Sequence, residues 1–430
     1  MAIAPVHAST QPAAPGSRTL FVLSLGLFFL WGLATVLIDI LVPKLKAVFL
    51  LSFAEVMLTQ FAFFLGYFAF SVPAGMLVTR IGYMRGIVVG LAVMAIGCLL
   101  FAPAASLGIY PGFLAALFIM AAGITLLQVS ANAVIAMVGR AETSSARLTL
   151  AQAFNSLGTF LGPFIGARMI LGGNIELPGD ISTLAPEALH ELQRAEASIV
   201  QTPFLMIAAL LAVLIVVFWF YRRLIPASPG NASAGGLGFN LLARKRVLFG
   251  VIAIFAYVGA EVSIGSMLAN YLMQPHTLAA TALHAGELVS LYWGGAMVGR
   301  FIGSLLLSRV EPGHVLSACA AAAIGLVLIS GVTSGVVSAG AIIGVGLFNS
   351  IMFPTIFSLG LKNAGDLAPK ISGLLCMGIV GGAILPVLTG LLADSASLEI
   401  ALVVPALGYM WVLFYGQFSA RDGVHKPLVA

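Results

Sequence analysis

Long apolar segments alternate with short polar ones along almost the whole chain. A helix needs roughly 20 predominantly apolar residues to cross the hydrocarbon core of a bilayer. Glycine and proline interrupt several of the apolar segments, which membranes tolerate because neighbouring helices satisfy the freed backbone groups. The pattern predicts an all-α membrane protein with twelve transmembrane helices, at residues 19–42, 56–79, 85–104, 111–138, 148–171, 203–221, 247–272, 286–308, 314–333, 335–361, 369–393 and 397–417.

Composition supports a membrane protein. Of the 430 residues, 60% are hydrophobic and only 8% are charged, whereas a soluble domain carries about 25% charged residues. The net charge of +5 does not indicate a nucleic-acid partner, because the charges cluster between the apolar segments. Cys98, Cys319 and Cys376 all lie inside apolar segments, so we expect no disulfide framework, metal site or cofactor.

The distribution of Lys and Arg predicts the orientation, since cytoplasmic loops carry an excess of positive charge. With both termini in the cytoplasm, the outer side holds Lys44, Lys46, Arg168 and Arg194, and Arg300 lies within a span. The inner side then holds 15 of the 20 Lys and Arg residues: Arg18, Arg80, Arg85, Arg140, Arg147, Arg222, Arg223, Arg244, Lys245, Arg246, Arg309, Lys362, Lys370, Arg421 and Lys426. A wrong span count would scramble this alternation.

The polar segments divide the chain into two halves. Residues 222–246, which are rich in Ser, Gly and Ala, fit a flexible cytoplasmic linker. Residues 186–199 of the acidic outer loop fit a short surface helix. The predicted organisation is a disordered tail at 1–18, a six-helix half at 19–221, the linker at 222–246, a second six-helix half at 247–417, and a tail at 418–430.

A faint internal repeat supports this division. Gly75–Arg80 ends the second span, and Gly303–Arg309 ends the eighth, so both segments occupy the same place in their half. Parallel six-helix repeats are the plan of the major facilitator superfamily. The segment Gly75–Arg85 also resembles the signature of that superfamily between helices two and three, with Thr79 in place of the usual aspartate.

Three ionisable residues lie inside predicted spans, namely Asp39, Glu261 and Arg300. Charges at that depth are costly and mark candidate functional sites. Burial disfavours the charged form of a carboxylate, so Asp39 and Glu261 are candidate reversible proton carriers. Alternatively, Asp39 lies at the outer membrane edge and pairs with Lys44 or Lys46. Arg300 is interpreted as extending to the cytoplasmic edge or as forming a structural pair.

Neutral polar residues form a second set of candidates. Amides carry both donors and acceptors, which suits the hydroxyl groups of a sugar, although membrane amides also hold helices together. Gln128 and Asn132 are four residues apart, so they share one helix face. Gln152 and Asn155 are three residues apart and share a face of the next helix. Aromatic rings complete a sugar site or simply pack. The candidates are Gln128, Asn132, Gln152, Asn155, Asn349, Trp31, Tyr257 and Trp293, and Asn270 belongs to the same polar set.

In these segments the chain resembles the fucose–galactose–glucose:proton symporter family, over about residues 19–418. The resemblance rests on Phe28–Ala34 with Asp39, Leu127–Asn132, Leu150–Gly158, Asn349–Gly360 and Ile371–Met377, the last typical of the glucose/galactose branch. It implies a sugar symporter of a bacterial inner membrane, with Asp39 at the family's proton-coupling aspartate. Gln128 replaces a glutamate of the fucose branch, and Val36 and Ile38 replace asparagines, whereas Glu261 fits the glucose/galactose-like branch.

The leading hypothesis is proton-coupled uptake of a hexose such as glucose or galactose by alternating access, with the sugar, protons and lipid as partners and a functional monomer. Sodium-coupled uptake, transport of fucose, fructose, N-acetylglucosamine or sucrose, and efflux of a non-sugar solute stay open. A non-transporting sensor is the other alternative, and it should carry a soluble signalling domain. Neither a phosphate loop, a metal triad nor a Ser/His/Asp arrangement indicates an enzyme.

Overall fold

The computed structural model describes residues 17–48, 53–107, 110–170, 186–223 and 237–424. Within these ranges the chain is helical and contains no strand. The N-terminal half consists of α1 (Ser17–Val48), α2 (Phe53–Ile81), α3 (Tyr83–Leu107), α4 (Tyr110–Leu127), η1 (Gln128–Asn132), α5 (Ala133–Met137), η2 (Ala141–Thr143), α6 (Ser144–Ile170) and α7 (Pro186–Phe220).

The C-terminal half has the same number of spans. It consists of η4 (Phe239–Ala243), α8 (Lys245–Leu272), α9 (Ala282–Leu307), α10 (Pro312–Val332), α11 (Gly335–Asn349), α12 (Met352–Gly360), η5 (Gly365–Leu367), α13 (Ala368–Met377), η6 (Gly378–Val380), α14 (Gly381–Ser395), α15 (Leu398–Ala401) and α16 (Val403–Val424). Each of the twelve predicted spans corresponds to one helix or to one broken helix. Among the described residues, eight helices are long and apolar enough to cross a membrane, and two shorter apolar helices lie at Thr19–Thr35 and Phe204–Phe220.

Several helices extend beyond their predicted spans; α1, for example, continues to Val48 rather than ending at residue 42. Residues 186–199 do not form a separate surface helix, because α7 runs without interruption from Pro186 to Phe220. The last helix, α16, continues to Val424 rather than ending at residue 417. An apolar segment marks only the part of a helix that lies in hydrocarbon, and backbone hydrogen bonding continues into the polar residues beyond it.

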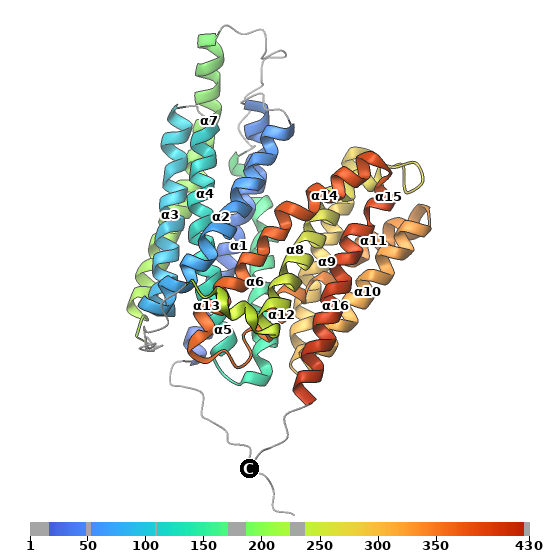
Figure 1. Cartoon of the computed structure of the whole chain (residues 1–430). Coiled ribbons are helices and arrows are strands. Elements are labelled where there is room, and N and C mark those ends of the chain that lie inside the picture. Colours follow the sequence, from blue (N-terminus) through green and yellow to red (C-terminus); the bar gives the residue numbers. More distant parts are fainter. Residues whose placement is uncertain (1–16, 49–52, 108–109, 171–185, 224–236, 425–430) are drawn as a thin grey trace, which may run out of the picture.

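The two halves approach each other at one end of the molecule. Figure 1 shows the N-terminal half (blue to green) and the C-terminal half (yellow to red) diverging toward the opposite end, while α12 and α13 lie beside α5 and α6. We call the closed end the linker end, because the chain passes from α7 to α8 there. Its contacts are short: the hydroxyl oxygens of Ser145 and Ser358 lie 2.6 Å apart, and the Ser372 hydroxyl donates to the carbonyl of Val129 at 2.8 Å.

The close crossing of α2 and α13 explains why glycine occupies position 75 in the repeated segment. A Cβ atom added at Gly75 would lie 2.7 Å from the carbonyl oxygen of Pro369. A side chain at that position would therefore force the two halves apart at the linker end.

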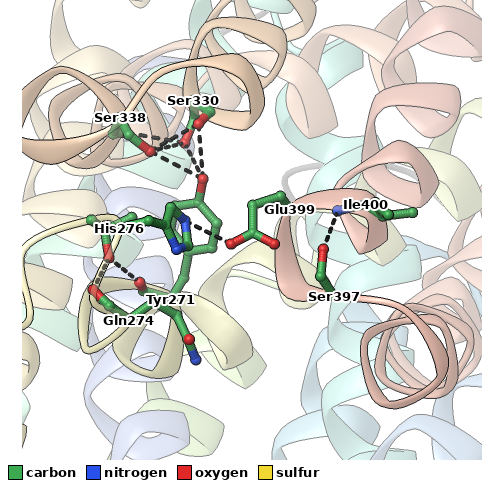
Figure 2. Close-up of polar contacts among 9 residues, drawn as sticks. Tyr271, Gln274, His276, Ser330, Ser338, Ser397, Glu399 and Ile400 are labelled. Atoms are coloured by element: carbon green, nitrogen blue, oxygen red, sulfur yellow. Dashed lines mark hydrogen bonds and ion pairs between the residues drawn. The ribbon is translucent and has the colours of Figure 1, made fainter.

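A buried polar network holds the opposite end of the C-terminal half together (Figure 2). The Tyr271 hydroxyl donates to the carbonyl of Ser330 at 2.9 Å and lies 3.0 Å from the Ser338 hydroxyl. Beside it, His276 Nε2 lies 2.7 Å from the carboxylate of Glu399, which connects the turn after α8 to the start of α15. These contacts therefore join the ends of α8 and α10 to the starts of α11 and α15.

Replacing Tyr271 by Phe should lower the free energy of unfolding by about 1 kcal/mol, because Ser330 and Ser338 lose one of their buried hydrogen-bond partners and keep those to each other. Denaturant unfolding in detergent measures this change. Tyr221→Phe is the matched control, since Tyr221 is 39% exposed at the end of α7 and its replacement should leave stability unchanged. Equal stability of the two variants would show that the network contributes nothing measurable.

Candidate functional site

The fourth span changes its helical geometry where two of the predicted amides lie. Gln128–Asn132 form a π-helical turn between α4 and α5. Such turns are rare in proteins overall, but those that occur often lie at functional sites. Gln128 Nε2 donates to the Tyr67 hydroxyl of α2 at 3.1 Å. Asn132 is fully buried, and within the described part of the chain its Nδ2 has no hydrogen-bond partner. The π-turn therefore offers an amide donor that a ligand hydroxyl would satisfy.

The fifth span, α6, brings the other two predicted amides of this half close to the π-turn. Buried Gln152 donates from Nε2 to Asn132 Oδ1 at 3.5 Å, the upper limit for such a contact. Asn155 Nδ2 instead donates to the carbonyl of Phe28 in α1 at 3.0 Å. This contact joins two helices, as amides in membrane proteins often do. A Cβ atom added at Gly32 would lie 2.0 Å from the Asn155 carbonyl oxygen, so α1 and α6 are in backbone contact.

The C-terminal half contributes a buried cluster of polar groups. Asn349, the last residue of α11, donates from Nδ2 to the Tyr292 hydroxyl at 2.7 Å, and that hydroxyl donates to the backbone carbonyl of Glu261 at 3.3 Å. Three buried atoms of this cluster have no hydrogen-bond partner among the described residues: Asn349 Oδ1, Glu261 Oε1 and the Tyr257 hydroxyl. The predicted carboxylate, one amide and one aromatic residue thus lie together on α8 and α11.

Arg300 connects this cluster to the other half. Its Nε donates to the carbonyl of Ser350 at 3.2 Å, in its own half. Its Nη1 donates to the Gln152 carbonyl at 3.4 Å and to the Ser156 hydroxyl, both on α6. Arg300 therefore forms structural pairs across the interface between the halves, the second of its two predicted interpretations.

The predicted aromatic residues differ in exposure. Trp31 is buried against Phe28, with ring centroids 5.4 Å apart. Tyr257 is also buried, whereas Trp293 is 46% exposed and meets the Tyr292 ring edge-on at 5.1 Å. Of these three, only Trp293 has a large exposed surface. Asn270 is exposed on α8.

The remaining predicted proton carrier, Asp39, lies on α1. Its side chain, like those of Lys44 and Lys46, lies outside the described residues, so the choice between its two interpretations stays open. Conversely, Tyr67 and Tyr292 contact two of the predicted amides but carry no distinguishing pattern in the sequence.

Known proteins resemble the chain over nearly its full length. The glucose/galactose transporter of Brucella abortus is 43% identical over 418 residues, covering 97% of this chain and 98% of the relative. The L-fucose-proton symporter of Escherichia coli is 35% identical over 416 residues, covering 94% of each chain. A crystal structure of the transporter FucP in the outward conformation superposes with a TM-score of 0.86 at 34% identity, covering 93% of this chain and 98% of FucP.

A family model agrees with these relatives. The model of the Major Facilitator Superfamily matches residues 20–379, which include the N-terminal half, the linker and the C-terminal half up to η6. Together with the twelve spans in two six-helix halves, this match shows that the chain is a multi-pass membrane protein that belongs to the major facilitator superfamily.

Proposed function

We propose that the protein carries a small sugar, a hexose such as glucose or galactose, together with protons by alternating access. One observation carries the proposal: Arg300 of the C-terminal half donates both to the carbonyl of Ser350, which follows Asn349, and to the carbonyl of Gln152 in the other half, so the polar groups of the two halves flank one interface. In this architecture the substrate lies between the two repeats near the bilayer midplane. The names of the relatives, two sugar transporters, agree with this substrate class.

Recognition of the sugar is assigned to the amides of Gln128, Asn132, Gln152, Asn155 and Asn349. Unpartnered groups such as Asn132 Nδ2 and Asn349 Oδ1 would gain hydrogen bonds from sugar hydroxyls, and no other partner for them lies in the described part of the chain. Aromatic side chains would pack against the apolar face of the ring. Trp31, Tyr257 and Trp293 are the candidates.

Coupling is assigned to Asp39 and Glu261. A charge in the low-dielectric interior is costly. Each carboxyl group would therefore be protonated in one part of the transport cycle and ionised in the other. When Glu261 is ionised it attracts Arg300, which also binds Gln152 and Ser156 of the other half. Protonation of Glu261 would weaken that attraction and so change the interface that must open.

The orientation follows from charge. The turns at the linker end hold or adjoin three basic residues, Arg140, Lys362 and Lys370. Cytoplasmic loops of membrane proteins carry an excess of Lys and Arg. With the linker end closed and cytoplasmic, the described conformation faces outward. We place the protein in a bacterial inner membrane with both termini in the cytoplasm, functional as a monomer.

Reporter fusions test this orientation. Fusions at residues 235 and 425 should report cytoplasm, because both lie on the basic side of the membrane, and a fusion at residue 185 should report periplasm. A periplasmic report at residue 235 would contradict the twelve-span orientation.

Uptake of a panel of labelled sugars into proteoliposomes tests the function. Glucose or galactose should accumulate when the outside is acidic, and the accumulation should collapse when the pH gradient is dissipated. If accumulation requires sodium instead of a pH gradient, then sodium and not the proton is the coupling ion. Absence of uptake for every sugar in the panel would overturn the substrate class.

A further inference from the structure

The same hydrogen bond occurs once in each half. In the N-terminal half, the Gln128 amide on the fourth span donates to the Tyr67 hydroxyl on the second. In the C-terminal half, the Asn349 amide on the fourth span donates to the Tyr292 hydroxyl on the second. The two pairs therefore occupy equivalent places in the six-helix repeat.

Both amides also lie at an interruption of their helix. Gln128 begins the π-helical turn, and Asn349 ends α11 just before the break that precedes α12. The flanking helices pack closely, since a Cβ atom at Gly66 would lie 2.6 Å from the Ala121 side chain and one at Gly346 would lie 2.1 Å from the Tyr292 carbonyl. Each tyrosine thus connects its own helix to an amide at the irregular part of the tightly packed neighbouring helix.

The contacts of Tyr292 determine which end of the Asn349 amide is available. A backbone carbonyl can only accept, so the Tyr292 hydroxyl must donate its single hydrogen to the carbonyl of Glu261. The hydroxyl oxygen then accepts from Asn349, which must present its Nδ2. Asn349 Oδ1 is left buried with no partner among the residues that the structure describes.

The N-terminal pair leaves the equivalent atom weakly bound. Among the residues that the structure describes, Gln128 Oε1 accepts only a long contact of 3.9 Å from the Cys376 thiol of α13, in the other half. A thiol is a weak donor, so a sugar hydroxyl would replace it with a gain in hydrogen bonding.

We propose that Tyr67 and Tyr292 are positioning residues that hold the N–H end of these two amides, so that Gln128 Oε1 and Asn349 Oδ1 accept hydrogen bonds from hydroxyl groups of the sugar, one from each half. This inference rests on the proposed function, because it names how the sugar is oriented. Neither tyrosine needs to touch the sugar itself.

Binding of deoxy analogues tests the positioning role. The dissociation constants of glucose, galactose and their monodeoxy analogues are measured by calorimetry for the purified protein. In the wild type, the analogue that lacks the sugar hydroxyl donating to Asn349 Oδ1 should bind about tenfold more weakly than the intact sugar. In Tyr292→Phe, glucose should bind about tenfold more weakly, while the penalty for that one deoxy position should nearly disappear. Tyr67→Phe should do the same at a different deoxy position.

The control is Tyr271→Phe, which removes a buried and hydrogen-bonded tyrosine hydroxyl from the polar network at the opposite end of the C-terminal half. Its analogue profile should match the wild type. A uniform loss of affinity for every analogue in both Tyr67→Phe and Tyr292→Phe would indicate a merely structural role and overturn the inference. So would wild-type profiles in both. If the wild type binds no sugar, the proposed function fails as well, which separates the two outcomes.

Discussion

Glu261→Gln should abolish sugar accumulation driven by a pH gradient while sugar still exchanges across the membrane. Glutamine keeps the shape of the protonated carboxyl group but cannot release a proton, so the cycle loses its proton-dependent step. Asp39→Asn should have the same effect. Accumulation under an imposed gradient and exchange without a gradient are measured in the same proteoliposomes.

Glu287→Gln is the matched control for this pair, because its carboxylate is 66% exposed at the start of α9. It should accumulate sugar as the wild type does. If Glu261→Gln also loses sugar binding, then Glu261 holds the sugar directly. If both variants accumulate sugar at the wild-type level, coupling through these carboxylates is wrong.

A disulfide across the linker end should stop transport almost completely. The Ser145 and Ser358 hydroxyl oxygens lie 2.6 Å apart on opposite halves, so cysteines in both positions are close enough to form a disulfide. The bond would hold the linker end closed, and alternating access requires that end to open. Uptake is measured after oxidation and again after reduction, which should restore it.

Two controls accompany this experiment. The single variants Ser145→Cys and Ser358→Cys should keep transport under oxidation, because the native cysteines Cys98 and Cys376 are buried and Cys319 is half-buried. Undiminished uptake by a protein that is demonstrably cross-linked would contradict alternating access at this interface.

The sequence predicts the fold well because membrane spans depend on a local property. Each apolar segment must satisfy its own backbone hydrogen bonds, so length alone places helices such as α8 within a few residues. Helix ends beyond the hydrocarbon are less determined, as α7 and α16 show. The π-helical turn at Gln128 and the break after Asn349 have no counterpart in apolar length, because neighbouring helices fix them.

The candidate site is predictable in its residue types but not in its contacts. Asp39, Glu261 and the amides are conspicuous because polar side chains are rare in spans. The pairing of Arg300 with α6 depends on how the two halves meet, which local spacing does not encode. Tyr67 and Tyr292 are ordinary among the aromatic residues of the chain until the structure places an amide beside each one.

Proton movement on addition of sugar tests the central claim most directly. Proteoliposomes that hold the purified wild-type protein are suspended in weakly buffered medium without sodium, and the external pH is followed as glucose or galactose is added. The account predicts an alkaline shift that depends on the sugar, is absent from protein-free vesicles and is lost in Glu261→Gln or Asp39→Asn. Sugar entry with no change in external pH would contradict it.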